Sequence, residues 1–188
     1  MIKKLTLIIG FIICLSSCGK DYVYRIEGEL SNLEGQTVYA VFEKDNYKVV
    51  DTVACTKPGQ FQIDQNEAGF HCVTIFFADK EHWVTAYLEP GETVKITGDA
   101  NSPLLLQVKG GRTNDKLTAF KKKIAPLLTE LTNLSNSLNS KDLNDTIEET
   151  DIAARLANVN MQLSEEAIRY VKENPDEEAS VVLIQSFF

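Results

Sequence analysis

The sequence predicts an α+β fold, in which an antiparallel β-sandwich or barrel-like domain over residues 22–110 precedes an α-helical region over residues 111–188. Before Gly110, short runs rich in β-branched and aromatic residues, such as Thr37–Phe42, are separated by turn signals about every ten residues, as in all-β domains. After Gly111, apolar residues recur every three or four positions, which is the period of an amphipathic helix.

The β part begins where Tyr22, Tyr24 and Ile26 alternate with polar residues, the pattern of a half-buried strand. Pro58-Gly59 and Pro90-Gly91 are strong turn dipeptides that separate later runs. Further strands are expected over 37–42, 48–55, 61–63, 70–77, 83–88, 93–97 and 104–108.

The helical region is predicted to contain helices over about 114–138, 146–173 and 175–188, the first two forming a hairpin with a shared apolar seam. Thr113 or Asn114 is expected to cap the first helix, and Pro126 to kink or divide it. Asn174-Pro175 is expected to start the third helix, with Asn as the cap and Pro at the first helical position.

The N-terminus has the pattern of a bacterial lipoprotein signal. A basic start precedes the apolar run Leu5–Leu15, which is shorter than the roughly 20 residues that span a bilayer. Leu15-Ser16-Ser17-Cys18 then resembles a processing box, so residues 1–17 form the predicted signal peptide, Cys18 the lipidation site and residues 18–21 a lipidated tether. Gly19 directly after Cys18 favours the outer membrane. The expected orientation is toward the periplasm, with the cell exterior as the open alternative. The alternative is an ordinary signal peptide with an incidental cysteine.

Charge bears on the partners. The formal net charge of −8 argues against nucleic acid as a partner, because its phosphates require clustered Lys and Arg. The expected partner of acylated Cys18 is the lipid bilayer. Lys121-Lys122-Lys123 is expected on a solvated helix face, with contact to lipid headgroups as the alternative.

Cys55 and Cys72 are the two cysteines left in the mature domain, in a compartment that permits disulfides. A bridge between them would close a short loop and stabilise the fold. The alternative is a pair of buried thiols that pack as small apolar groups.

Few residues of the sequence are candidates for catalysis or for binding a metal or an anion. His71 and Cys72 are adjacent, so in a strand they face opposite ways, and His82 lies beside Asp79 in a polar turn where a weak metal site is the lesser alternative. Gly110–Thr113 precedes a helix and could cradle an anion, although a hinge and helix cap is the favoured interpretation. We therefore predict no catalytic residue, no metal site and no cofactor.

A set of short motifs in the β part resembles a known family. The matching motifs are Ile26-Glu27-Gly28, Val50-Asp51-Thr52, Gly59-Gln60-Phe61, Leu88–Glu92, Ile96–Asp99, Val108–Gly110 and Asn114, followed later by Glu173-Asn174-Pro175. On these residues, the stretch from Tyr24 to Leu117 resembles uncharacterised lipoprotein domains that precede thioredoxin-like (TlpA-type) thiol–disulfide reductases in Bacteroidetes-type bacteria. The resemblance implies a domain of unknown function. The Cys-x-x-Cys pair of the longer relatives does not occur in this sequence.

The expected function is that of a non-catalytic, membrane-anchored lipoprotein domain of the cell envelope, with a binding or accessory role. The alternative is the N-terminal part of a thioredoxin-like thiol–disulfide oxidoreductase whose catalytic domain is missing from this chain. Besides the bilayer, the expected partner is another envelope protein or that C-terminal domain.

Overall fold

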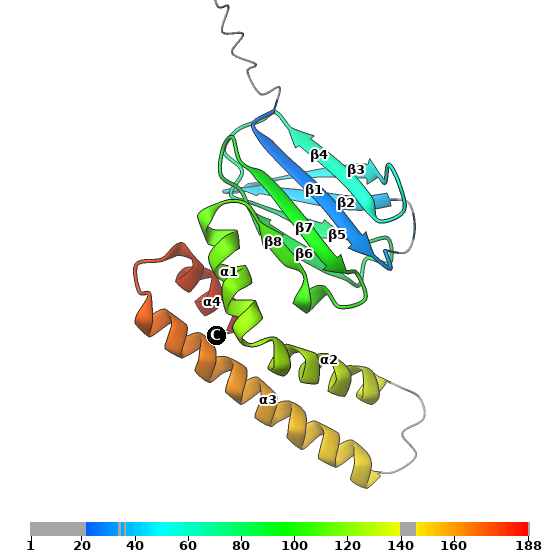
Figure 1. The fold of residues 1–188 in the computed structure, drawn as a ribbon, viewed down its shortest axis with the longest axis vertical. Coiled ribbons are helices and arrows are strands. Elements are labelled where there is room, and N and C mark those ends of the chain that lie inside the picture. Colours follow the sequence, from blue (N-terminus) through cyan, green and yellow to red (C-terminus); the bar gives the residue numbers. More distant parts are fainter. Residues whose placement is uncertain (1–21, 34, 36, 140–145, 188) are drawn as a thin grey trace, which may run out of the picture.

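The computed structural model describes residues 22–33, 35, 37–139 and 146–187. The predicted signal peptide (1–17), the lipidation site Cys18 with its tether (18–21) and the connection over 140–145 lie outside the described residues. A β-sandwich lies at one end of the molecule, and a long helical hairpin lies at the other (Figure 1).

The sandwich consists of two four-stranded sheets, sheet A in the order β4-β1-β7-β8 and sheet B in the order β3-β2-β5-β6. This confirms the predicted sandwich, and the two sheets do not close into a barrel. The strands are β1 (Tyr24–Ser31), β2 (Thr37–Lys44), β3 (Tyr47–Ala54), β4 (Gln60–Gln65), β5 (Cys72–Phe76), β6 (Trp83–Tyr87), β7 (Thr93–Asp99) and β8 (Gln107–Lys109).

One strand pair departs from the antiparallel expectation. β1 and β7 run parallel, with Arg25 opposite Thr93 and Ser31 opposite Asp99. Parallel neighbours need a long connection, and here the segment between β1 and β7 builds all of sheet B and strand β4 before it returns. Local alternation cannot show this pairing because it depends on where a distant segment returns.

The sandwich core consists of the side chains that alternate inward from both sheets, and Ile26, Phe42 and Ile75 are among those with no exposed surface. One family motif is explained by packing in sheet A. Gly28 lies opposite Phe61 in the β1–β4 register, and a Cβ atom on Gly28 would lie 2.2 Å from the Phe61 ring. The glycine therefore makes room for the neighbouring aromatic ring.

The register of sheet B separates the two cysteines of the domain. Cys72 lies opposite Glu43 on β2, whereas Cys55 follows Ala54, which lies opposite Thr37. At roughly 3.3 Å per residue, Thr37 and Glu43 are about 20 Å apart along β2. A disulfide requires Cα atoms within about 7 Å, so the candidate bridge is not formed and both residues are free thiols.

The helices are α1 (Arg112–Lys123), α2 (Ala125–Asn139), α3 (Thr146–Glu173) and α4 (Glu178–Phe187), preceded by the short 3-10 turn η1 (Pro103–Leu105). The predicted division at Pro126 is confirmed, since Pro126 is the second residue of α2, where a missing N–H breaks no helical hydrogen bond. The predicted strand over 104–108 is shorter than expected, because Pro103 starts η1 and only β8 remains extended.

The predicted start of the last helix is wrong by a few residues. Asn174 closes α3 instead: its backbone N–H and its side-chain amide both donate to the Tyr170 carbonyl, each at 2.9 Å. Pro175 then lies in the turn, and α4 begins at Glu178. An Asn-Pro pair fits the end of one helix as well as the start of the next, and the contacts to Tyr170 decide between the two.

Helix α1 closes one edge of the sandwich. Asn114 accepts a hydrogen bond from the Tyr87 N–H (2.9 Å) and donates one to the Tyr87 carbonyl (2.7 Å) at the edge strand β6. One turn later, Thr118 bonds the N–H (3.1 Å) and carbonyl (2.6 Å) of Val108 in the other edge strand, β8. The helix thus supplies hydrogen bonds that a further strand would make. The expected cap by Thr113 or Asn114 is wrong, because Gly111 is the N-cap.

Candidate functional site

A groove of about 650 Å³ lies between β6, η1 and the four helices. Trp83, Thr85 and Tyr87 form its wall on the sandwich side. The helices supply the rest of the wall, chiefly through Leu117, Phe120, Lys121, Ile124, Leu128, Leu131, Asn160, Leu163, Ser164, Val182, Leu183 and Phe187. The groove therefore lies where the helical layer meets one edge of the sandwich.

The apolar lining of the groove comes from the stripes predicted on the helices. Their innermost residues, such as Phe120 and Leu163, are 4% and 3% exposed and form a second hydrophobic cluster beside the sandwich core. At the mouth of the groove, Trp83 is 54% exposed and Leu104 is 43% exposed. Large apolar side chains thus remain accessible where the sandwich and the helices meet.

Lys121 is the one charged side chain among the described residues that line the groove. It lies four residues after Leu117 and three before Ile124, so it occupies the apolar stripe of α1. Burial lowers the pKa of Lys121. Within the described part of the chain, no carboxylate forms an ion pair with its ammonium group.

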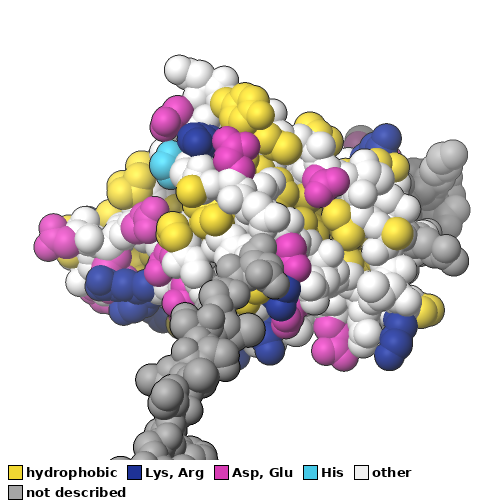
Figure 2. Space-filling model, turned by 90° about the horizontal axis from the view of Figure 1, so that it is seen from above, with side chains coloured by type: hydrophobic (Ala, Val, Ile, Leu, Met, Phe, Trp, Pro, Cys, Tyr) yellow, Lys and Arg dark blue, Asp and Glu magenta, His cyan; other side chains and the backbone are white. Residues whose placement is uncertain are grey.

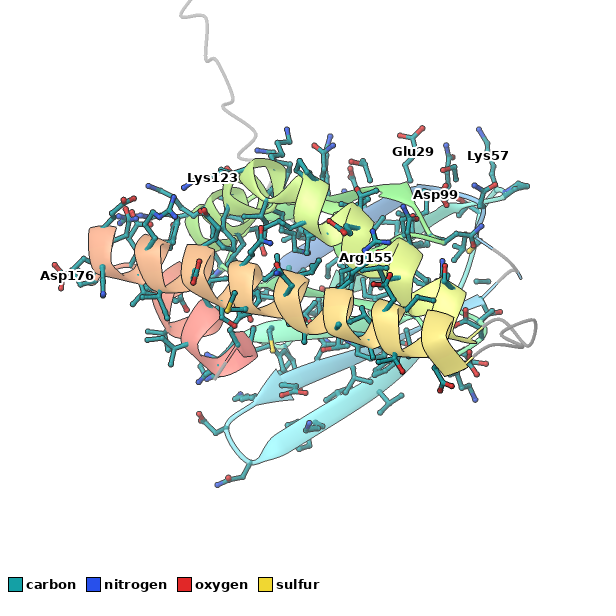
Figure 3. The ribbon with its side chains drawn as sticks, turned by 90° about the horizontal axis from the view of Figure 1, so that it is seen from below. Glu29, Lys57, Asp99, Lys123, Arg155 and Asp176 are labelled. Carbon is teal, nitrogen blue, oxygen red and sulfur yellow. The ribbon has the colours of Figure 1, made fainter. Side chains whose placement is uncertain are left out.

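The lysine cluster therefore divides. Lys122 is exposed, and the Lys123 ammonium lies 3.2 Å from a Glu166 carboxylate oxygen on α3 (Lys123 is labelled in Figure 3). The expectation of a solvated face thus fails for Lys121. Its spacing from Leu117 and Ile124 is the sequence signal that could have shown this.

Two other helices are joined by an ion pair. Arg155 of α3, labelled in Figure 3, forms an ion pair with Glu130 of α2 at 3.1 Å and ties the hairpin together. On the face seen in Figure 2, acidic and basic side chains are interspersed among hydrophobic ones.

The glycine-containing turn before α1, which could have bound an anion, is occupied by an acidic side chain of the same chain. Glu89 accepts a hydrogen bond from the Arg112 backbone N–H at 2.7 Å, so a carboxylate of the chain occupies the place where an external anion could bind. Gly110 has a φ of +100°, and a Cβ atom there would lie 2.2 Å from the Thr93 carbonyl oxygen. These contacts support the interpretation of this turn as a hinge and cap.

A second, polar hollow of about 260 Å³ lies between α1 and the start of α4. Polar side chains in its wall also bond to other groups of the protein. Glu177 accepts hydrogen bonds from Lys116 (2.8 Å) and from the Tyr170 hydroxyl (2.8 Å), and both hold the pKa of Glu177 below its usual value. Thr113 donates to Glu178 at 2.7 Å. This cluster joins α1 to the start of α4 and pairs Glu177 and Glu178 with neighbouring side chains.

The histidines lie in surface positions. In the β5–β6 turn, Asp79 bonds the His82 Nδ1 atom at 2.5 Å and the backbone N–H groups of Glu81 and His82. The bond to His82 lowers the pKa of Asp79. These contacts hold a turn in which both side chains are 42% exposed, as expected for a surface turn. His71 contacts Asp45 at 3.3 Å in the solvent-exposed β2–β3 corner. The residues that the structure describes contain no group of three His, Cys, Asp or Glu side chains placed to hold a metal ion.

Neither of the two cysteines belongs to the groove lining. Burial raises the pKa of both Cys55 and Cys72, which keeps them as neutral thiols near pH 7 and lowers their nucleophilicity. No helix in the described ranges is both long and apolar enough to cross a membrane.

A β-sandwich closed at one edge by a helix, with an apolar groove under a helical layer, defines an α+β domain. The chain belongs to a family described as a domain of unknown function (DUF4369), whose model matches residues 24–117. The match covers the sandwich and the first half of α1, including Gly28, Phe61 and Asn114, whose contacts are given above. No curated protein and no solved structure matches this chain.

Proposed function

We propose that this chain is a non-catalytic, lipid-anchored module of the bacterial cell envelope, and that it binds its ligand in the groove. The observation that carries the binding role is the groove itself, about 650 Å³ in volume with mainly apolar walls. Small-molecule sites have volumes of roughly 300–1,000 Å³ and combine apolar walls with a few polar groups. The groove has these properties.

The anchoring role rests on the N-terminal sequence. Leu15–Cys18 has the form of a lipoprotein processing box, and Cys18 would carry the acyl chains. Several acyl chains on one residue give stable membrane attachment, which a single chain does not. With Gly19 next to Cys18, the proposed location is the outer membrane, with the domain facing the periplasm.

The non-catalytic role is supported by what the chemically versatile side chains do in the fold. Asp79 and His82 stabilise a turn, and Asn114 and Thr118 bond the edge strands. These four side chains therefore have structural roles.

The test of anchoring is labelling of the full chain with an alkyne fatty acid in a Gram-negative host. The wild type is expected to be labelled and to fractionate with the outer membrane, and Cys18→Ser to lose both properties. Cys14→Ser, which changes a cysteine of the signal segment, is the matched control and should behave as the wild type. Equal labelling of Cys18→Ser, or wild-type protein in the inner membrane, would contradict the proposal.

A second candidate function is to dock a thioredoxin-like module, because the chain resembles lipoprotein domains that precede such modules in longer proteins. The observation that favours it is the outer surface of α4, where Val181 is 52% and Ile184 46% exposed. Reading the coding sequence past Phe188 tests this candidate. An open frame that runs into a Cys-x-x-Cys motif would support it, and a stop codon would exclude a module in the same chain.

A further inference from the structure

We infer that the groove binds a single acyl chain with a negatively charged head group, as in a fatty acid, with Lys121 pairing with the carboxylate. This inference rests on the proposed function and names the class of its ligand. The acyl chain would lie against the leucines of α1, α2 and α3, and the carboxylate would lie at the Lys121 ammonium.

The first argument is charge. Lys121 is a partly buried cation in an apolar wall, and none of the described carboxylates pairs with it. Burying a charged group is unfavourable unless it is paired. The lowered pKa of Lys121 has the same cause, namely the loss of hydration at the ammonium group. A bound carboxylate would supply the missing negative charge.

The second argument is the contrast with two other lysines of α1, Lys116 and Lys123, which the fold does pair. Lys116 has Glu177 at 2.8 Å, and Lys123 has Glu166 at 3.2 Å. Both neighbours lie on α1 with Lys121, so the same helix holds two paired lysines that face other elements and an unpaired one on its apolar stripe.

The third argument is the chemistry of the remaining wall. Leu117, Leu128 and Leu131 present aliphatic surface, which suits an alkyl chain. Asn160 and Ser164, one turn apart on α3, also line the groove and could bond the second carboxylate oxygen. Thr85 and Thr118 are already bonded, to Thr74 and to Val108.

The natural probe of the groove is Trp83, the single tryptophan of the chain, which lies in its wall. The full chain with Cys18→Ser is titrated with decanoate and with decanol while the Trp83 emission is recorded. Decanoate is expected to shift the emission in a saturable way and to bind more tightly than decanol.

The variant Lys121→Gln should weaken decanoate binding about tenfold, since it removes a charge-assisted hydrogen bond, and should leave decanol binding unchanged. Lys122→Gln removes an exposed charge one residue away and is the matched control, expected to bind both compounds as the parent does. The thermal midpoint of Lys121→Gln should equal or exceed that of the parent, because an unpaired, partly buried charge is removed.

Each other outcome overturns the inference. Equal binding of decanol and decanoate, unaffected by Lys121→Gln, would leave a binding groove without a role for the charge, so the proposed binding function would survive alone. Saturable binding of decanoate in isothermal titration calorimetry without a change in the Trp83 emission would place the ligand elsewhere. No binding of either compound would refute the acyl ligand, while Cys18 labelling still decides the anchoring.

Discussion

The two hydrophobic clusters of this molecule differ in how completely they are closed. In the sandwich, Ile26, Val38 and Phe42 have no exposed surface, and both sheets cover them from opposite sides. In the helical layer, the buried leucines are 3–6% exposed, and their outer neighbours open onto the groove. A sheet pair encloses its apolar side chains between two layers, whereas helices packed against a sheet edge leave some of theirs accessible. The sandwich is therefore the more completely closed part of the molecule, and the helical layer is where the proposed binding groove lies.

The largest effect is expected from opening the closed cluster. Phe42→Ala removes a ring that has no exposed surface and lies 5.4 Å, between centroids, from the Phe70 ring. The expected loss is about 3–5 kcal/mol in the free energy of unfolding, since the cavity cannot collapse. Urea unfolding followed by circular dichroism measures it. Val50→Ala, at a position that is 67% exposed in the same sheet, is the control and should change stability by no more than about 0.5 kcal/mol.

The next largest effect is expected at the junction between the two clusters. Asn114→Ala leaves the Tyr87 N–H and carbonyl without their side-chain partner, at a residue that is 2% exposed. Each unsatisfied buried group costs about 1–3 kcal/mol, so the expected loss is about 2–3 kcal/mol. Lys122→Ala on the exposed face of α1 is the control. Hydrogen exchange should show faster exchange at Tyr87 in the first variant only, and unchanged protection would contradict the role of Asn114.

A smaller effect is expected in the open cluster. Leu163→Ala truncates a residue that is 3% exposed but faces the groove, so it enlarges an existing hollow instead of creating an enclosed one. The expected loss is about 2 kcal/mol, at the low end of leucine truncations. Urea unfolding measures it beside Phe42→Ala. A loss as large as that of Phe42→Ala would show that the helical cluster is as closed as the sandwich.

The smallest effect is expected at the contact between α1 and α4, and it depends on pH. Lys116 and Tyr170 hold the pKa of Glu177 below the usual glutamate value of 4.5, so the ionised carboxylate stabilises the fold above that value. This contribution is lost as the pH falls through the lowered pKa.

Glu177→Gln should therefore lower the thermal midpoint at pH 7, and the difference from the wild type should shrink at acidic pH. Glu165→Gln, at an exposed position of α3, is the control and should show no such trend. A difference between Glu177→Gln and the wild type that stays constant down to pH 3 would contradict the ion pair.

The candidate site could be predicted only in part. The apolar stripes of the helices and the division at Pro126 follow from residue spacing, which is a local property. That Lys121 is partly buried could also have been found, because its position follows from the spacing to Leu117 and Ile124. The groove itself could not, since its wall combines β6 with four helices that are distant in the sequence.

The sequence by itself determined the two halves of the fold, because the periods of strands and helices are set by local backbone geometry. Tertiary structure alone decided the rest: the parallel pairing of β1 with β7, the separation of Cys55 from Cys72, and the filling of the α1 turn by Glu89. Each of these depends on which distant segments meet. Contacts between distant segments are selected by the packing of the whole chain, and no local pattern encodes them.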